Sequence, residues 1–206
     1  MVAATGAYLL LGDTIRAARY AAPAPAVVEQ PSDDARIATS AIRPERIDLP
    51  AAGVSTIVEP APATEELNAF TGEVVSTFPV PGGPFTTVWW EEGPRPGEDG
   101  LAVILGHTRA AGAAVFNDLP VIDAGAPLGV TGRTDAGDEV VARYVVSEVV
   151  TAIPKEDAVA LRAVLDAPPP GATLALITCS GEVDAELDSR EDNTVVFATL
   201  EGAYRR

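Results

Sequence analysis

The stretch Leu174-Ala175-Leu176-Ile177-Thr178-Cys179 is an apolar run that ends in the single cysteine of this 206-residue chain. A second run, Leu101-Ala102-Val103-Ile104-Leu105-Gly106-His107, ends in the single histidine. Short apolar runs that are bounded by turn residues predict buried β-strands. Each of these two strands would therefore present a reactive side chain at its end, where a rigid scaffold displays functional groups to solvent.

Glycine and proline, 18 residues of each, divide the rest of the chain into short segments. This favours turns and short strands over long helices. We expect a short helical turn at 111–119 and a helix at 155–165, which begins after Pro154 and is stopped by Pro168-Pro169-Pro170. Strands at this spacing predict an all-β fold, a barrel or a sandwich, and we favour a closed barrel with one or two short helices. The segments that read as strands are 45–49, 54–58, 86–91, 101–106, 128–133, 139–150, 173–179 and 193–200.

The N-terminal part of the chain differs in composition from the rest. Residues 1–20 form a short apolar segment, in which Val2 to Gly12 would span only about 16 Å as a helix. A bilayer core needs roughly 20 apolar residues, so a remnant of a membrane anchor and a surface helix are the two hypotheses. Residues 21–42 are rich in Pro and Ala and predict a flexible linker. We expect one folded domain at 43–200 and a C-terminal tail at 201–206.

Charge and composition exclude several classes of function. A formal net charge of −16 would repel a phosphate backbone, so we expect no nucleic-acid partner. One cysteine cannot form an internal disulfide. One cysteine and one histidine also leave too few soft ligands for zinc, so we expect neither a metal ion nor a cofactor. Lysine occurs once, at Lys155, against 13 arginines, and we interpret this skew as the coding bias of a GC-rich genome.

Cys179 and His107 are candidates for nucleophilic catalysis. A thiol is a strong nucleophile only as thiolate, which an imidazolium or a guanidinium beside it stabilises. The small polar neighbours Thr178 and Ser180 place the thiol at an open strand edge, and His107 would transfer protons to and from an amine. The plainer alternatives are a small buried hydrophobe for the cysteine and a strand cap for the histidine.

Arg190 is a third candidate, 11 residues beyond Cys179 and just before the last expected strand. Its guanidinium has a fixed fork of donors that suits the oxyanion of a tetrahedral intermediate or a substrate carbonyl. The alternative is a surface arginine paired with Glu191 or Asp192.

Together these residues resemble the sortase family of cysteine transpeptidases. Gly106-His107, followed by Phe116-Asn117-Asp118-Leu119 and Gly125, is similar to the family's Gly-His after a strand with its downstream Phe-x-x-Leu and turn glycine. Leu176-Ile177-Thr178-Cys179 is similar to the Leu-x-Thr-Cys signature. Asp192-Asn193-Thr194-Val195-Val196-Phe197-Ala198 resembles the closing strand of the actinobacterial class F and class E group, with class F the nearer. Further matches to that group, within a resemblance that covers 43–200, are Arg46-Ile47-Asp48-Leu49-Pro50, Gly53-Val54, Trp89-Trp90 and Gly93-Pro94-Arg95-Pro96-Gly97-Glu98.

The resemblance implies an eight-stranded β-barrel at the extracellular face of the membrane, anchored at the N-terminus in the full-length form. It implies that a Leu-Pro-x-Thr-Gly-like sorting motif of secreted proteins is cleaved between Thr and Gly through a thioester on Cys179. An amine of a peptidoglycan precursor or a pilin would then resolve the thioester. The catalytic residues implied are His107, Cys179 and Arg190.

Three positions depart from the family pattern. Ala126 follows Gly125 where an acidic residue is common, and Ala175 stands where many members have Thr. The residue two before Asn193 is Glu191, so Arg190 is one step out of register, and one step along a strand turns a side chain to the other face.

Two other functions compete with catalysis by a sortase. A non-catalytic barrel that binds an envelope peptide or protein would also fit the departure at Arg190. A papain-like hydrolase fits poorly, because its cysteine precedes its histidine and lies on a helix.

Overall fold

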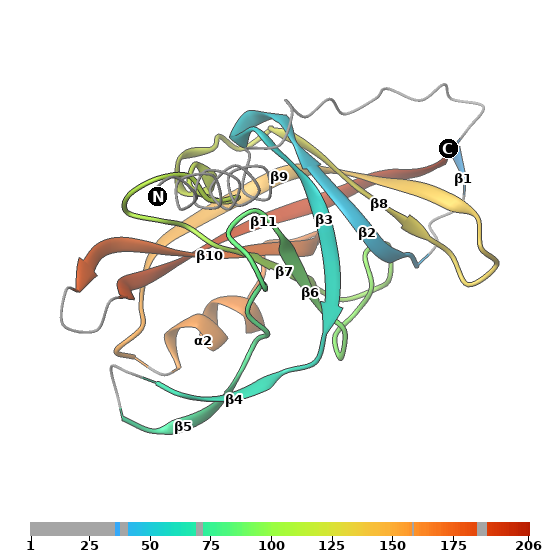
Figure 1. Cartoon of the computed structure of the whole chain (residues 1–206). Helices are drawn as coiled ribbons and strands as arrows, with labels where there is room; N and C mark the ends of the chain where they lie inside the picture. The colour runs from blue at the N-terminus through green and yellow to red at the C-terminus, as the bar shows by residue number, and fades with distance from the viewer. Residues whose placement is uncertain (1–35, 38–40, 69–71, 158, 185–188) are drawn as a thin grey trace, which may run out of the picture.

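The computed structural model describes a barrel of β-strands with few short helices (Figure 1). The predicted apolar segment 1–20 lies outside the described residues, and so does the predicted linker 21–42 except for 36–37 and 41–42. In the described part of the chain, every helix is too short or too polar to cross a bilayer. The described residues are 36–37, 41–68, 72–157, 159–184 and 189–206.

Eight strands close the barrel, in the order β11-β10-β7-β6-β3-β2-β8-β9, because β9 pairs again with β11. The pairs β3–β6 and β7–β10 are parallel, and the other neighbours are antiparallel. The prediction of an all-β, closed eight-stranded barrel is therefore confirmed. The barrel strands are β2 (Arg43–Leu49), β3 (Val54–Ala61), β6 (Thr87–Trp90), β7 (Ala102–Gly106), β8 (Pro127–Arg133), β9 (Glu139–Pro154), β10 (Ala172–Asp184) and β11 (Ser189–Arg205).

Within the described residues, three further strands lie outside the closed barrel. The short strand β1 (Arg36–Ile37) pairs with the end of β11, at Ala203 and Tyr204. The strands β4 (Thr64–Leu67) and β5 (Val74–Thr77) form a separate hairpin. Since β11 continues to Arg205, the predicted tail at 201–206 lies almost wholly in the last strand.

Side chains of β10 alternate between two apolar clusters. Leu174 and Leu176 point into the barrel, where they join residues from all the other barrel strands. Ala175 and Ile177 point outward and pack in a smaller cluster that includes Phe197 and the helix α2 (Ala160–Asp166), which we call the outer cluster. Because strand side chains alternate with a period of two, Cys179 follows Ala175 and Ile177 on the outer face. The thiol is therefore placed outside the barrel core.

The barrel interior holds one buried phenol. Tyr144 is completely buried, and its hydroxyl oxygen accepts a hydrogen bond from the backbone N–H of Gly97 at 2.9 Å. Burial raises the pKa of Tyr144 far above its usual range, since the phenolate would lose its hydration.

The two predicted helices differ from the structure. The short helical turn predicted at 111–119 is found only as hydrogen-bonded turns at 115–118, which lead into a 3-10 helix, η3 (Leu119–Val121). Here the N–H of Val115 donates to Pro84 and the N–H of Phe116 donates to His107, so these amides bond to other segments. The helix predicted at 155–165 begins only at Ala160.

Candidate active site

His107 and Cys179 lie at the carboxyl ends of two neighbouring parallel strands. The register of β7 and β10 pairs Leu105 with Ile177, so two further steps bring His107 beside Cys179. The hydroxyl of Thr178 donates to the carbonyl of Gly106 at 2.7 Å, and the hydroxyl of Thr108 donates to the carbonyl of Cys179 at 2.9 Å. Both candidate side chains are half-buried, so solvent reaches them.

Close packing around Gly106 sets the position of His107. The ring of Phe116 lies so near to Gly106 that an added Cβ would overlap it. The backbone N–H of Phe116 also donates to the carbonyl of His107 at 2.9 Å. The Nε2 atom of His107 lies 2.9 Å from the carbonyl oxygen of Pro81, which only accepts, so Nε2 carries a proton in this arrangement. The Gly-His pair and the downstream Phe thus form one packed unit.

The two strands that pair with β11, which are β9 and β10, each contain a bulge near the thiol of Cys179. On β10, Cys179 is opposite Asn193, but an extra residue after Ser180 brings Val183 opposite Arg190. On β9, Asn193 is opposite Ile153, whereas Val195 is opposite Val150, so β9 contains one residue more than β11. A bulge at the end of a sheet changes the direction in which the following side chains point.

The bulge in β9 contains Ala152, the one described non-glycine residue with positive φ, at 55°. This left-handed conformation is unfavourable for a residue with a Cβ atom. Its effect is to place Val150 and Ile153 on the same outer face, although they are three positions apart and regular alternation would put them on opposite faces. The residue two steps beyond Ile153 is Lys155, which the bulge therefore directs toward the face that carries Cys179.

Lys155 contacts the thiol. Its Nζ atom lies 3.3 Å from Cys179 Sγ and 3.3 Å from Ser189 Oγ. Its backbone N–H donates to the carbonyl of Glu191 at 2.9 Å. Sequence reasoning missed this residue because it took the scarcity of lysine as coding bias. The sequence feature that could have identified Lys155 is its rarity, since it is the single lysine in a chain with 13 arginines and directly follows a strand.

Arg190 binds the bulge on β10. Its Nη1 atom donates to the carbonyl of Gly181 at 2.6 Å, and among the described residues its buried Nε atom has no hydrogen-bond partner. Arg190 and Asn193 are three residues apart on β11, and Asn193 is the residue opposite Cys179. Alternation along the strand therefore turns Arg190 toward the opposite face from the thiol.

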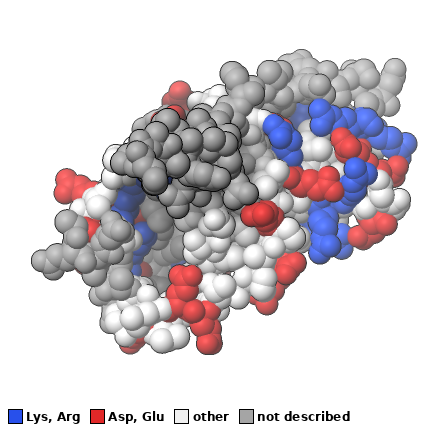
Figure 2. Space-filling view, in the orientation of Figure 1, with Lys and Arg blue, Asp and Glu red and all other residues white. Residues whose placement is uncertain are grey.

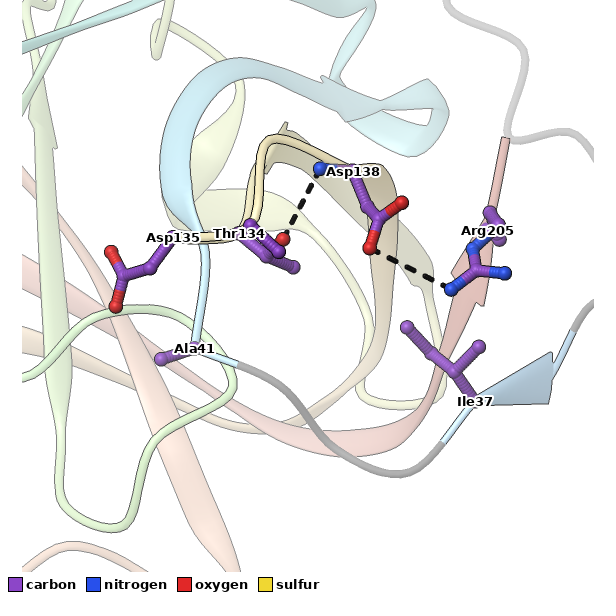
Figure 3. Close-up of a pocket in the computed structure, with 7 residues that line it drawn as sticks. Ile37, Ala41, Thr134, Asp135, Asp138 and Arg205 are labelled. Carbon is purple, nitrogen blue, oxygen red and sulfur yellow. Dashed lines mark hydrogen bonds and ion pairs between the residues drawn. The ribbon is translucent and has the colours of Figure 1, made fainter.

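A pocket of about 450 Å³ lies far from these residues, between β1, the β8–β9 turn and the end of β11 (Figure 3). Arg205 forms an ion pair with Asp138 at 3.6 Å, and the Asp138 N–H donates to Thr134 Oγ1 at 3.2 Å. Arg205 is separated from Asn193 by a length of extended strand on the order of 40 Å. The pocket is therefore not part of the candidate active site.

Charges at the pocket end are paired. Figure 2 shows arginine side chains gathered among acidic ones at the end of the barrel where β1 and the C-terminus lie. Arg95 donates to Asp135 at 2.8 Å, and this hydrogen bond lowers the pKa of the Asp135 carboxyl. Across the described segments, no three His, Cys, Asp or Glu side chains are grouped so that they could hold a metal ion.

Comparison with known proteins gives a consistent result for the domain and the fold. A model of the sortase domain matches residues 47–201. Sortase A of Listeria monocytogenes is 16% identical, with 81% of this chain and 91% of that chain covered and a TM-score of 0.51. The complex of Streptococcus agalactiae sortase C1 and MTSET is 16% identical, with 94% and 88% covered and a TM-score of 0.50. At this identity the solved structures show a shared fold, and no curated protein matches the chain.

Proposed function

The chain belongs to the sortase family, and we propose that it is a cysteine transpeptidase in which Cys179 is the nucleophile and His107 transfers protons. The observation that carries this proposal is the pairing of β7 with β10, which brings the histidine and the cysteine to neighbouring strand ends. Both side chains are half-buried, so a substrate can reach them.

The proposed reaction has two steps, formation of a thioester and its resolution by an amine. The thiolate of Cys179 attacks the carbonyl carbon of Thr in a Leu-Pro-x-Thr-Gly-like motif, and the Thr–Gly C–N bond breaks. His107 gives its proton to the departing glycine amine, which leaves a thioester on the cysteine. An amine then attacks the thioester carbon, His107 takes the amine's proton, and the C–S bond breaks to restore the thiolate.

Arg190 is the proposed partner of the oxyanion on the basis of the family resemblance alone. In the structure its guanidinium holds the carbonyl of Gly181, two residues after Cys179. Because alternation along β11 turns this side chain away from the thiol, it would have to reorient to reach an oxyanion there. Substitution of Arg190 is therefore expected to lower activity by less than substitution of Cys179 or His107.

The finer identity of the enzyme rests on the sequence motifs. We propose that it belongs to the class F or class E group of sortases and acts at the outer face of the cell membrane. Its partners would be secreted proteins with a sorting motif and an amine of a peptidoglycan precursor or a pilin. The stretch from Asp192 to Ala198 supports the class assignment.

The test is cleavage of fluorogenic five-residue sorting peptides by the purified chain. We expect Cys179→Ala to abolish cleavage and His107→Ala to lower kcat/KM by about 10²–10⁴-fold. Arg162→Gln, on the exposed surface of α2, is the matched control and should keep full activity. Full activity of Cys179→Ala would reject the proposal. Peptide binding without cleavage by the wild type would support the alternative, a non-catalytic barrel that binds an envelope peptide.

A further inference from the structure

We propose that Lys155 is a catalytic residue of this site: its ammonium group holds the Cys179 sulfur as thiolate before attack and again when the thioester is resolved. The inference rests on the proposed function, because it assigns a second group to the same nucleophile. It goes beyond that function because neither the sequence motifs nor the family resemblance assigns a role to any lysine.

The contact has the chemistry that a thiolate requires. An ammonium group has three N–H donors and no acceptor. In the structure, Lys155 directs one donor to Cys179 Sγ and one to Ser189 Oγ, each at 3.3 Å. Hydrogen bonds to an ionised acceptor are about twice as strong as those between neutral groups, so this contact strengthens when the sulfur is charged.

Neighbouring groups hold the lysine in place from several sides. Its backbone N–H donates to the carbonyl of Glu191, which fixes the start of the side chain against β11. The hydroxyl of Ser189 accepts from the ammonium and donates to the carbonyl of Arg190, so its own proton does not compete. The left-handed Ala152 in the β9 bulge sets the face on which the lysine emerges. A strained residue that turns a cation toward a nucleophile is the pattern expected of a functional site.

The two cationic side chains near the thiol, Arg190 and Lys155, bind different groups. The guanidinium of Arg190 binds a backbone carbonyl in the β10 bulge, whereas the ammonium of Lys155 contacts the reacting atom. The lysine therefore supplies the positive charge beside the sulfur that the sequence analysis expected from an imidazolium or a guanidinium. It takes part in no bond-making step and keeps its proton throughout the reaction.

The experiment measures alkylation of Cys179, the single thiol of the chain, by anionic iodoacetate and by neutral iodoacetamide. A cation beside the sulfur favours thiolate and also attracts the anionic reagent. We expect Lys155→Met to slow both reagents and to lower the iodoacetate-to-iodoacetamide rate ratio about fivefold to tenfold. Lys155→Arg should restore most of the ratio. The matched control, Arg162→Met, removes one charge from the exposed surface of α2 and should leave the ratio unchanged.

An unchanged rate ratio in folded Lys155→Met would overturn the assignment. If that variant fails to fold, the wild type can be acetylated in its folded state, because Lys155 carries the only lysine ammonium. Hydroxylamine then frees any acetylated sulfur, and the same fall in the ratio is expected. No fall in the ratio after acetylation would also overturn the assignment.

The readout separates this inference from the proposed function, because alkylation needs no sorting peptide. If the wild type cleaves no peptide but Lys155→Met still lowers the rate ratio, the proposed function is refuted and the contact between Lys155 and Cys179 is supported. Incubation with sorting peptide adds one more outcome. A hydroxylamine-resistant acyl group on Lys155 would overturn the assignment, because the amine would then act as an acceptor and not as a charged partner of the sulfur.

Discussion

The two ends of strand β11 are built differently. At the Arg205 end, residues Gly202–Arg205 pair one for one with Val140–Arg143 of β9, and Arg205 forms an ion pair with Asp138. At the Asn193 end, both neighbouring strands contain a bulge, and charged and polar side chains gather around the sulfur of Cys179. Pairing at the Arg205 end is therefore regular, whereas the bulges at the Asn193 end select the groups that meet the nucleophile.

The difference has a physical cause. Regular alternation keeps polar side chains out of the barrel core, so it leaves no freedom to choose which residues face a given point. An extra residue in one strand shifts that alternation by one step. Ala152 makes this shift possible by adopting a left-handed conformation, which has an energetic cost. The packing of the rest of the barrel offsets that cost.

The largest effect is expected from Ala152→Val, which strains the β9 bulge. Ala152 has a left-handed φ of 55°, a conformation that is strongly unfavourable for a β-branched residue. We expect a loss of up to about 3 kcal/mol in the free energy of unfolding, measured by urea denaturation, and a lower reactivity of Cys179 toward iodoacetate because the bulge orients Lys155. The substitution Ala152→Gly keeps the bulge and is the control. Normal stability with normal iodoacetate reactivity of Ala152→Val would show that the bulge does not orient Lys155.

A second prediction concerns the packed unit beside the thiol. Gly106→Ala places a Cβ against the ring of Phe116, and overpacking of this kind costs about 1–3 kcal/mol. Because the amide of Phe116 binds His107, peptide cleavage should fall as well. Gly82→Ala, which has open space around it, is the matched control for thermal unfolding and activity. A Gly106→Ala protein as stable and active as the control would contradict this packing.

The buried interior of the barrel gives a third prediction, through Tyr144 of β9. Tyr144→Phe leaves the buried N–H of Gly97 without its acceptor, which costs about 1–3 kcal/mol at neutral pH. Burial raises the pKa of Tyr144 in the folded state above the unfolded value near 10, so stability is lost as pH rises past 10. Between pH 9 and 11 the wild type should lose about 1.4 kcal/mol more than Tyr144→Phe. Parallel stability curves for the two proteins would contradict the pKa direction.

The smallest effect is expected at the pocket end. Arg205 and Asp138 are both exposed, and such an ion pair contributes at most about 0.5 kcal/mol, which salt screens. Arg205→Gln should therefore leave urea denaturation nearly unchanged and peptide cleavage unaffected. A loss above 1 kcal/mol would mean that the paired charges, and not only the regular ladder, hold this end together.

Sequence reasoning predicted the barrel because its strands have buried alternating faces and turn residues at their ends. It missed the hairpin of β4 and β5, since Thr64–Leu67 is exposed on both faces and shows no apolar pattern. It began the helix too early because the Lys155 amide bonds across to Glu191, a contact that no local pattern reveals. An alanine at position 152 does not indicate a bulge. With regular alternation and no bulge, the sequence does not place Lys155 on the face that carries Cys179.

In the proposed reaction Cys179, in β10, forms a covalent bond to the substrate. The most direct measurement is mass spectrometry of the wild-type chain after incubation with a sorting peptide and no acceptor amine, quenched in acid and digested. We expect the acyl mass on the fragment that contains Cys179, and its removal by hydroxylamine. Peptide cleavage with no adduct on that fragment, or with the acyl group on another residue, would contradict it.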